Sequence, residues 1–160
     1  EGVFSEDVTG ENAQHSMDSL GVAYSDFGVE LSAPSRGAVV WALIKEIGVE
    51  GLRQRIQRHN AMARYVADRV MKSGQLELLL VPTLSICCFR YIDAHCEDLN
   101  ALNRQIYSQL VRKGNNIPST TIVDGCVVIR PCFIGARTGW QQAKDLVDEV
   151  LEIGDAITSY

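Results

Sequence analysis

Apolar residues between positions 32 and 74 recur with the 3.6-residue period of α-helices. Ser32 and Pro34 are typical of a helix start, because the hydroxyl can cap free N–H groups and proline fits the first turn. Gly48 predicts the end of this first helix, and Gly74 the end of a second, longer one. The second helix is expected to turn an arginine-rich face outward. Its predicted apolar stripe consists of Leu52, Ile56, Met62, Ala63, Val66 and Val70.

Further along the chain the pattern becomes that of strands. Two short apolar runs, residues 76–81 and 85–92, are joined by a connection too short for a helix, so we expect them to pair antiparallel. Residues 120–123 and 126–129 flank Asp124-Gly125, a strong signal for a two-residue hairpin. The second half of the chain therefore contributes four short strands.

Two helices alternate with these strands. Residues 98–113 carry a helical apolar face, and Gly114 predicts the end of that helix. The last helix is expected to run from about Thr138, as its cap, to about Ile157. This order gives an α+β fold, in which two linking helices precede a small antiparallel sheet packed against helices.

Composition narrows the class of protein. The chain has 160 residues, of which 46% are hydrophobic, and a formal net charge of −5. It can therefore form a real core, and its acidity argues against a nucleic-acid-binding surface. No apolar run approaches the roughly 18 residues of a membrane span, and the first residues do not have the pattern of a signal peptide. We expect a soluble, cytoplasmic protein with no nucleic-acid or membrane partner.

Familiar catalytic and metal-binding motifs are not found in the sequence. The five cysteines form an odd set without zinc-site spacing, and we expect them to be reduced and structural, with no metal site. There is no phosphate-binding glycine loop and no nucleophile elbow. His15, His59 and His95 are predicted to be solvated side chains rather than catalysts.

Arg130 stands out among the charged residues. It ends the apolar strand and is followed by Pro131. A guanidinium in that position must find an anion or several carbonyls, since an unpaired buried charge is very costly. Its planar fork suits bidentate binding of a carboxylate. The alternative is a structural salt bridge to one of the chain's many acids.

Arg36 is the second arginine of interest. It lies at a helix start, where the helix dipole already supplies partial positive charge. It could bind a phosphate or carboxylate there, or pair with Glu30 or Asp26. Arg90 and Arg137 carry weaker forms of the same argument.

Five blocks of sequence resemble one enzyme family, in the same order. They are FGVELSAPSRGAVVW (residues 27–41), GVEGL (48–52), LSICCFR (84–90), IPSTT (117–121) and VIRPCFI (128–134). Together they resemble the C-terminal third of the pyridoxal-phosphate-dependent group II amino-acid decarboxylases. These enzymes have fold type I, that of the aspartate aminotransferase superfamily. The family includes aromatic-amino-acid, glutamate and diaminobutyrate decarboxylases.

The resemblance implies a domain organisation. In this family, two helices leave the large cofactor-binding domain and lead into a small C-terminal domain. Residues 1–31 would then be an extended or mobile segment, in the place of the family's catalytic loop. Residues 32–74 would be the linking helices, and residues 75–160 the small α+β domain. The loop tyrosine that protonates the reaction intermediate in relatives has only Tyr24 as a weak candidate here.

The resemblance also implies chemistry. The family binds pyridoxal phosphate through a lysine that follows a histidine, and none of this chain's four lysines does so. We therefore expect the chain to begin after that lysine, to bind no cofactor alone and to be inactive alone. Arg130 matches the family's arginine that binds the substrate carboxylate. Arg36 has no such match and stays a weaker candidate for substrate binding, from its place at the helix start alone.

The leading hypothesis is the C-terminal part of a pyridoxal-phosphate-dependent amino-acid decarboxylase, a carboxy-lyase of amino-acid and carboxylic acid metabolism. It would supply carboxylate binding for an amino-acid substrate and part of a homodimer interface. One alternative is a free-standing α+β module that binds a small carboxylate or mediates assembly. Another is part of an aminotransferase-like enzyme that uses the same cofactor.

Overall fold

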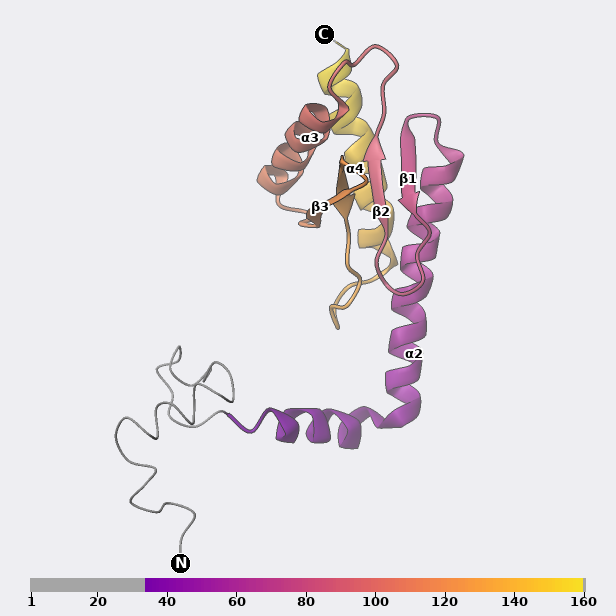
Figure 1. Cartoon of the computed structure of the whole chain (residues 1–160). Coiled ribbons are helices and arrows are strands. Elements are labelled where there is room, and N and C mark those ends of the chain that lie inside the picture. The colour runs from indigo at the N-terminus through magenta and orange to yellow at the C-terminus, as the bar shows by residue number, and fades with distance from the viewer. Residues whose placement is uncertain (1–33, 160) are drawn as a thin grey trace, which may run out of the picture. The chain divides into compact units, whose positions relative to one another are not determined.

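The computed structural model describes residues 34–159 (Figure 1). Tyr24, His15 and the expected cap Ser32 lie outside the described residues. The chain divides after Glu46 into two compact units. Helix α2 spans Arg36–Lys72 and is broken at Gly48, whose φ of 69° and ψ of 172° are not helical. The two helices predicted on either side of Gly48 are therefore confirmed.

In the first unit, the described part of α2 exposes large apolar side chains. Val39 and Trp41 are 72% and 64% exposed, and Val40 and Ile44 are also exposed. Lys45 lies over the Trp41 ring, 5.9 Å from its centroid.

The second unit contains a four-stranded antiparallel sheet with the order β1-β2-β4-β3. The strands and helices after α2 are β1 (Leu76–Leu80), β2 (Cys88–Tyr91), α3 (Leu99–Lys113), β3 (Ser119–Val123), β4 (Cys126–Arg130) and α4 (Trp140–Thr158). The predicted antiparallel pairing of β1 with β2 and the β3–β4 hairpin are both confirmed. Asp124 (φ 47°) and Gly125 (φ 77°) form the hairpin turn, in the left-handed conformation that Asp and Gly tolerate best.

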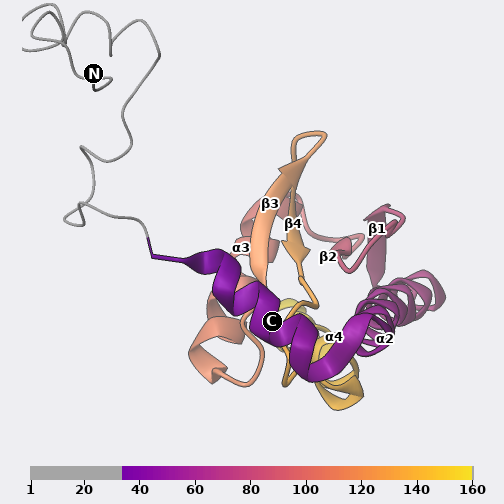
Figure 2. The ribbon, with the colours of Figure 1, turned by 90° about the horizontal axis from the view of Figure 1, so that it is seen from below.

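The helices α3 and α4 cover one face of the sheet (Figures 1 and 2). Phe89, Tyr91 and Ile129 point from the sheet into this core. The C-terminal half of α2 adds Met62, Ala63, Val66 and Val70, and α4 adds Ala143, Leu146, Val147, Val150 and Ile153. Because successive strand residues alternate between faces, the side chains next to these core residues emerge on the opposite face of the sheet.

Three details differ from the sequence predictions. Ile56 is 50% exposed and does not belong to the apolar stripe of α2. His59 takes a place on the buried face of that helix and is only 5% exposed, so its prediction as a solvated side chain is wrong. Gly139, not Thr138, is the N-cap of α4; its N–H donates to Oε1 of Gln142 at 2.8 Å.

Candidate carboxylate-binding site

A row of four side chains crosses the face of the sheet that α3 and α4 leave uncovered. Ser119 of β3 is the register partner of Arg130 of β4. The pairing of Phe89 with Ile129, and the bridge between Ile86 and Cys132, place Cys88 of β2 opposite Arg130 on its other side. Leu80 of β1 pairs with Cys88. Residues directly opposite in an antiparallel sheet share a face, so Arg130 lies between a hydroxyl and a thiol.

Ser119 holds the base of the Arg130 guanidinium. The Nε–H group of Arg130 donates a hydrogen bond to Ser119 Oγ at 3.1 Å. The same hydroxyl donates to the backbone carbonyl of Arg130 at 3.0 Å. Both side chains are half-buried. These two bonds orient the guanidinium, while its two terminal nitrogens have no hydrogen-bond partner in the described part of the chain.

No carboxylate among residues 34–159 forms an ion pair with Arg130. Arg90, on the neighbouring strand, shows the opposite arrangement. Its Nε lies 2.6 Å from the Glu77 carboxylate, and Glu77 is its register partner on β1. The salt-bridge alternative therefore describes Arg90, whereas Arg130 keeps an uncompensated charge within the described residues.

The Cys88 thiol does not supply the missing negative charge. Burial raises the pKa of Cys88, and the positive charge of Arg130 lowers it by a smaller amount. The thiol is therefore neutral at ordinary pH. A site with a fixed cation, a neutral hydroxyl and a neutral thiol is suited to binding an anion.

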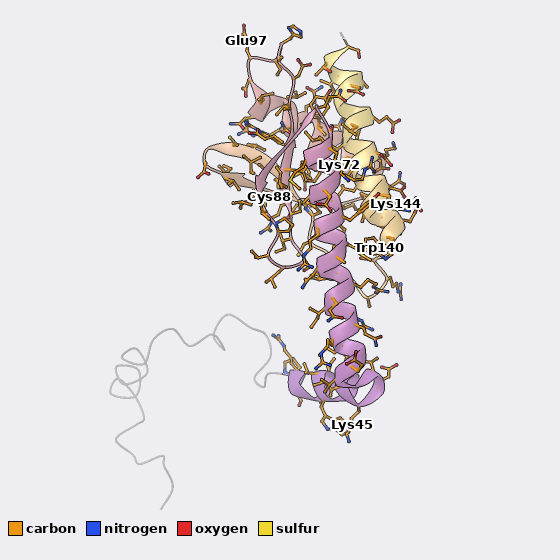
Figure 3. All side chains as sticks on the ribbon, turned by 90° about the vertical axis from the view of Figure 1, so that its right-hand side faces the viewer. Lys45, Lys72, Cys88, Glu97, Trp140 and Lys144 are labelled. Atoms are coloured by element: carbon orange, nitrogen blue, oxygen red, sulfur yellow. The ribbon has the colours of Figure 1, made fainter. Side chains whose placement is uncertain are left out.

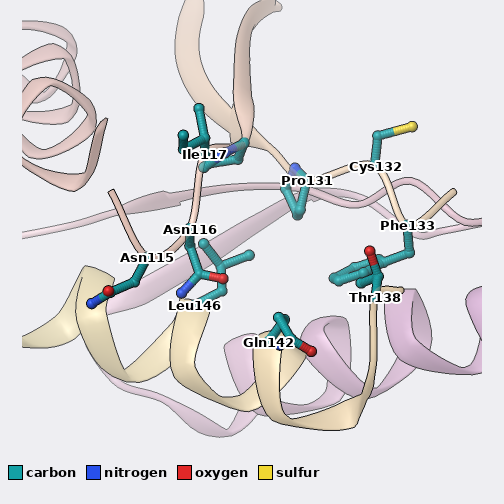
Figure 4. A pocket seen from close by; sticks show the side chains of 10 residues that line it. Asn115, Asn116, Ile117, Pro131, Cys132, Phe133, Thr138, Gln142 and Leu146 are labelled. Carbon is teal, nitrogen blue, oxygen red and sulfur yellow. The ribbon is translucent and has the colours of Figure 1, made fainter. Parts of the chain in front are cut away.

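A hollow of about 210 Å³ begins at Pro131 and Cys132, directly after Arg130 (Figure 4). Phe133, Leu146 and Ile117 supply apolar lining; Thr138 precedes the N-cap of α4, and Gln142 lies in the first turn of that helix. The remaining lining residues are Asn115, Asn116 and Pro118. The two asparagine side chains donate to the buried carboxylate of Glu149 at 2.7 and 2.9 Å, which fixes the connection between α3 and β3.

The other predicted site residues are not brought to this row. Arg36 is exposed in the first turn of α2 and forms no ion pair with any residue that the structure describes. Its possible partners Glu30 and Asp26, like Tyr24, lie outside the described residues. His95 is exposed as predicted. The Nε2 atom of the buried His59 has no hydrogen-bond partner among residues 34–159.

The sequence analysis missed Ser119 and Cys88 as neighbours of Arg130. A signal for Ser119 was present, because a two-residue turn at Asp124-Gly125 fixes the register of the hairpin. Counting back from that turn pairs residue 119 with residue 130. Cys88 had no such signal, because the β2–β4 pairing joins strands separated by a whole helix.

The chain's lysines do not fit a pyridoxal-phosphate site. All four are exposed on helices, and none lines the hollow that begins at Pro131 and Cys132. Figure 3 shows Lys45, Lys72 and Lys144 on α2 and α4. Lys113 is 2.8 Å from the Glu152 carboxylate. An imine-forming lysine must instead be positioned in a cleft and easily lose its proton.

Two further features are absent from the described region. No group of three or more His, Cys, Asp or Glu side chains within residues 34–159 is placed to hold a metal ion. None of the helices described is both long and apolar enough to cross a lipid bilayer.

Comparison with known proteins identifies the family. The pyridoxal-dependent decarboxylase conserved domain matches residues 7–92, more than half of the chain. The chain belongs to the pyridoxal-dependent decarboxylase family. The group II resemblance seen in the sequence is thereby confirmed.

Relatives of this decarboxylase-family chain include enzymes of aromatic amino acids. It is 27% identical over 140 residues to the aromatic-L-amino-acid decarboxylase of Bacillus atrophaeus, covering 86% of this chain and 29% of that protein. It is 28% identical over 144 residues to tyrosine decarboxylase 4 of Petroselinum crispum, covering 82% of this chain and 28% of that protein. The chain thus spans less than a third of the length of these curated relatives.

The fold agrees with that of a solved structure. The Oryza sativa TDC with PLP and tryptamine superimposes with a TM-score of 0.73 at 22% identity, covering 83% of this chain and 29% of that one. The α+β fold predicted from the sequence is therefore confirmed.

Proposed function

We propose that this chain is the C-terminal part of a pyridoxal-phosphate-dependent amino-acid decarboxylase, and that Arg130 binds the α-carboxylate of the substrate. One observation supports the role of Arg130 above the others. It is a half-buried guanidinium held by a hydroxyl, with no carboxylate partner among the described residues. A substrate carboxylate would neutralise this guanidinium and accept two hydrogen bonds from it.

The proposed substrate is an aromatic L-amino acid. This proposal rests on the names of the relatives, an aromatic-L-amino-acid decarboxylase and a tyrosine decarboxylase. The cofactor of the whole protein is proposed to be pyridoxal phosphate, bound through a lysine that this chain does not contain. We therefore expect the isolated chain to be inactive.

The proposed organisation follows the family. Residues 32–74 would connect a large cofactor-binding domain to a small C-terminal domain formed by residues 75–160. The whole enzyme is proposed to be a cytoplasmic homodimer that acts on no nucleic acid. The exposed apolar side chains of the first part of α2 support a connection to further protein, because monomeric proteins rarely expose such a cluster. The free-standing module is less consistent with that exposure.

The test uses the complete protein that carries this sequence. An immunoblot of its own cells first gives the size of the native polypeptide, which should far exceed 17.6 kDa. The purified protein, loaded with pyridoxal phosphate, is then assayed for CO₂ release from a panel of L-amino acids. Activity should be highest with aromatic substrates.

The role of Arg130 is tested by substitution. Arg130→Lys should lower kcat/KM about 10- to 100-fold, because lysine cannot make the bidentate contact. Arg137→Lys is the matched control, since Arg137 is exposed and forms no ion pair within the described region. Equal kcat/KM values for Arg130→Lys and the wild type would rule out the proposed role.

A further inference from the structure

The sheet contains two arginines whose Nε–H groups each donate to a cross-strand side chain, which is a carboxylate in one case and a hydroxyl in the other. Arg90 and Arg130 lie on the adjacent strands β2 and β4. Each donates its Nε–H to its register partner on an edge strand, Glu77 on β1 and Ser119 on β3. Glu77 both orients and neutralises Arg90. Ser119 orients Arg130 without neutralising it.

The rest of the row keeps Arg130 uncompensated. Its other cross-strand neighbour is the thiol of Cys88, and beyond that lies Leu80 of β1. No acid occupies the row. Ser119 also donates to the Arg130 carbonyl, so its hydroxyl is fixed at both ends and cannot rotate freely. The hydrogen bond from Arg130 Nε to this hydroxyl therefore restrains the orientation of the guanidinium.

We propose that Ser119 is a positioning residue for the carboxylate site, holding the Arg130 guanidinium so that its two terminal nitrogens are presented to the carboxylate. This inference rests on the proposed function of Arg130. An arginine side chain that is already oriented loses less conformational freedom when it binds, so its affinity for a carboxylate is higher. A carboxylate at position 119 would instead form an ion pair with Arg130, as Glu77 does with Arg90.

Three substitutions separate orientation from charge. Ser119→Ala removes the acceptor and should free the guanidinium. Ser119→Thr keeps the hydroxyl and should preserve binding. Ser119→Asp supplies a competing anion and should weaken carboxylate binding more than Ser119→Ala does. Arg130→Met removes the cation itself and provides the reference background.

The measurement uses the complete protein loaded with its cofactor, and two competitive inhibitors that differ in one group. 3-Phenylpropionate carries a carboxylate, whereas phenethylamine does not. Ser119→Ala should raise the inhibition constant of 3-phenylpropionate about 3- to 10-fold, and Ser119→Asp by more than 10-fold. Neither substitution should change the inhibition constant of phenethylamine more than twofold. In the Arg130→Met background, Ser119→Ala should have no further effect, since positioning needs the group that is positioned.

Different results overturn different claims. If Ser119→Ala weakens both inhibitors equally, or has the same effect with and without Arg130, Ser119 is only structural and the inference fails. An unchanged inhibition constant for 3-phenylpropionate in Ser119→Ala also refutes the inference about Ser119. If Arg130→Met binds 3-phenylpropionate much more weakly in the same experiment, the proposed function of Arg130 still stands. If Arg130→Met itself does not weaken 3-phenylpropionate, the proposed function fails and this inference fails with it.

Discussion

The side-chain amide of Asn103 replaces a strand partner for the backbone of Tyr91. Its Oδ1 accepts from the Tyr91 N–H at 2.8 Å, and its Nδ2 donates to the Tyr91 carbonyl at 2.8 Å. A third bond joins Nδ2 to the Leu99 carbonyl one turn earlier in α3. Asn103 is completely buried, so these bonds tie α3 to the end of β2 inside the core.

Asn103→Leu is expected to destabilise the chain by about 2–4 kcal/mol. The leucine keeps the branched shape of asparagine but leaves the N–H and carbonyl of Tyr91 buried without partners, each costing about 1–3 kcal/mol. Urea unfolding followed by circular dichroism measures the loss. Gln105→Ala, an exposed amide on the same helix, should change stability by less than about 0.5 kcal/mol. Equal stabilities for the two variants would contradict the burial and bonding of Asn103.

Gly154 allows the Tyr91 ring to lie against α4. A Cβ atom at position 154 would lie within 2.3–2.7 Å of three atoms of that ring. Gly154→Ala is therefore expected to destabilise by about 1–3 kcal/mol through overpacking, despite the better helix propensity of alanine. Gly37→Ala is the control, because a Cβ there meets nothing within 4 Å on an exposed helix. A fall in the unfolding temperature of Gly154→Ala only is the expected result; a rise in both would show that the ring does not contact this turn.

The Cys87 thiol should make the folded state less stable at high pH. Burial raises its pKa to about 12, with a further contribution from the neighbouring Cys88. The folded protein therefore keeps this proton between about pH 9 and 12, whereas the unfolded chain loses it. Because the folded state binds more protons in that window, stability is complete below about pH 9 and falls as pH rises toward 12. The loss could reach about 4 kcal/mol at the upper end.

The pH effect is measured as the difference between variants. Cys87→Ala should show a shallower fall in unfolding free energy between pH 8 and 10.5 than the wild type, whatever its stability at neutral pH. Cys132→Ala, which changes an exposed thiol, should keep the wild-type slope. Burial also raises the pKa of Cys88 and Tyr91, so part of the slope should remain in Cys87→Ala. Parallel slopes in all three proteins would contradict the burial of the Cys87 thiol.

Local signals in the sequence predicted most of the fold. The Asp124-Gly125 turn and the left-handed Gly114 at the end of α3 act over a few residues, so the sequence shows them directly. The β2–β4 pairing depends on how α3 crosses the sheet, which no local pattern specifies. For His59 a local pattern was present but misleading, because the arginines around it suggested a solvated helix face.

The site was predicted in part. Arg130 was singled out because a charged residue at the end of an apolar strand needs a partner. Which partner it has depends on the residues opposite, and there Arg90 and Arg130 differ by a glutamate and a serine. The serine opposite Arg130 follows from the hairpin register, which the turn fixes, whereas Cys88 on the other side of Arg130 becomes visible only once the sheet order is known.

The central claim is that Arg130 binds a substrate carboxylate, and one measurement tests it most directly. Inhibition constants of 3-phenylpropionate and phenethylamine are compared for the complete wild-type protein and Arg130→Met. The account predicts that 3-phenylpropionate binds at least 10-fold more weakly to the variant, while phenethylamine binds within twofold of the wild type. A variant that binds both compounds as the wild type does, or loses both equally, would contradict it.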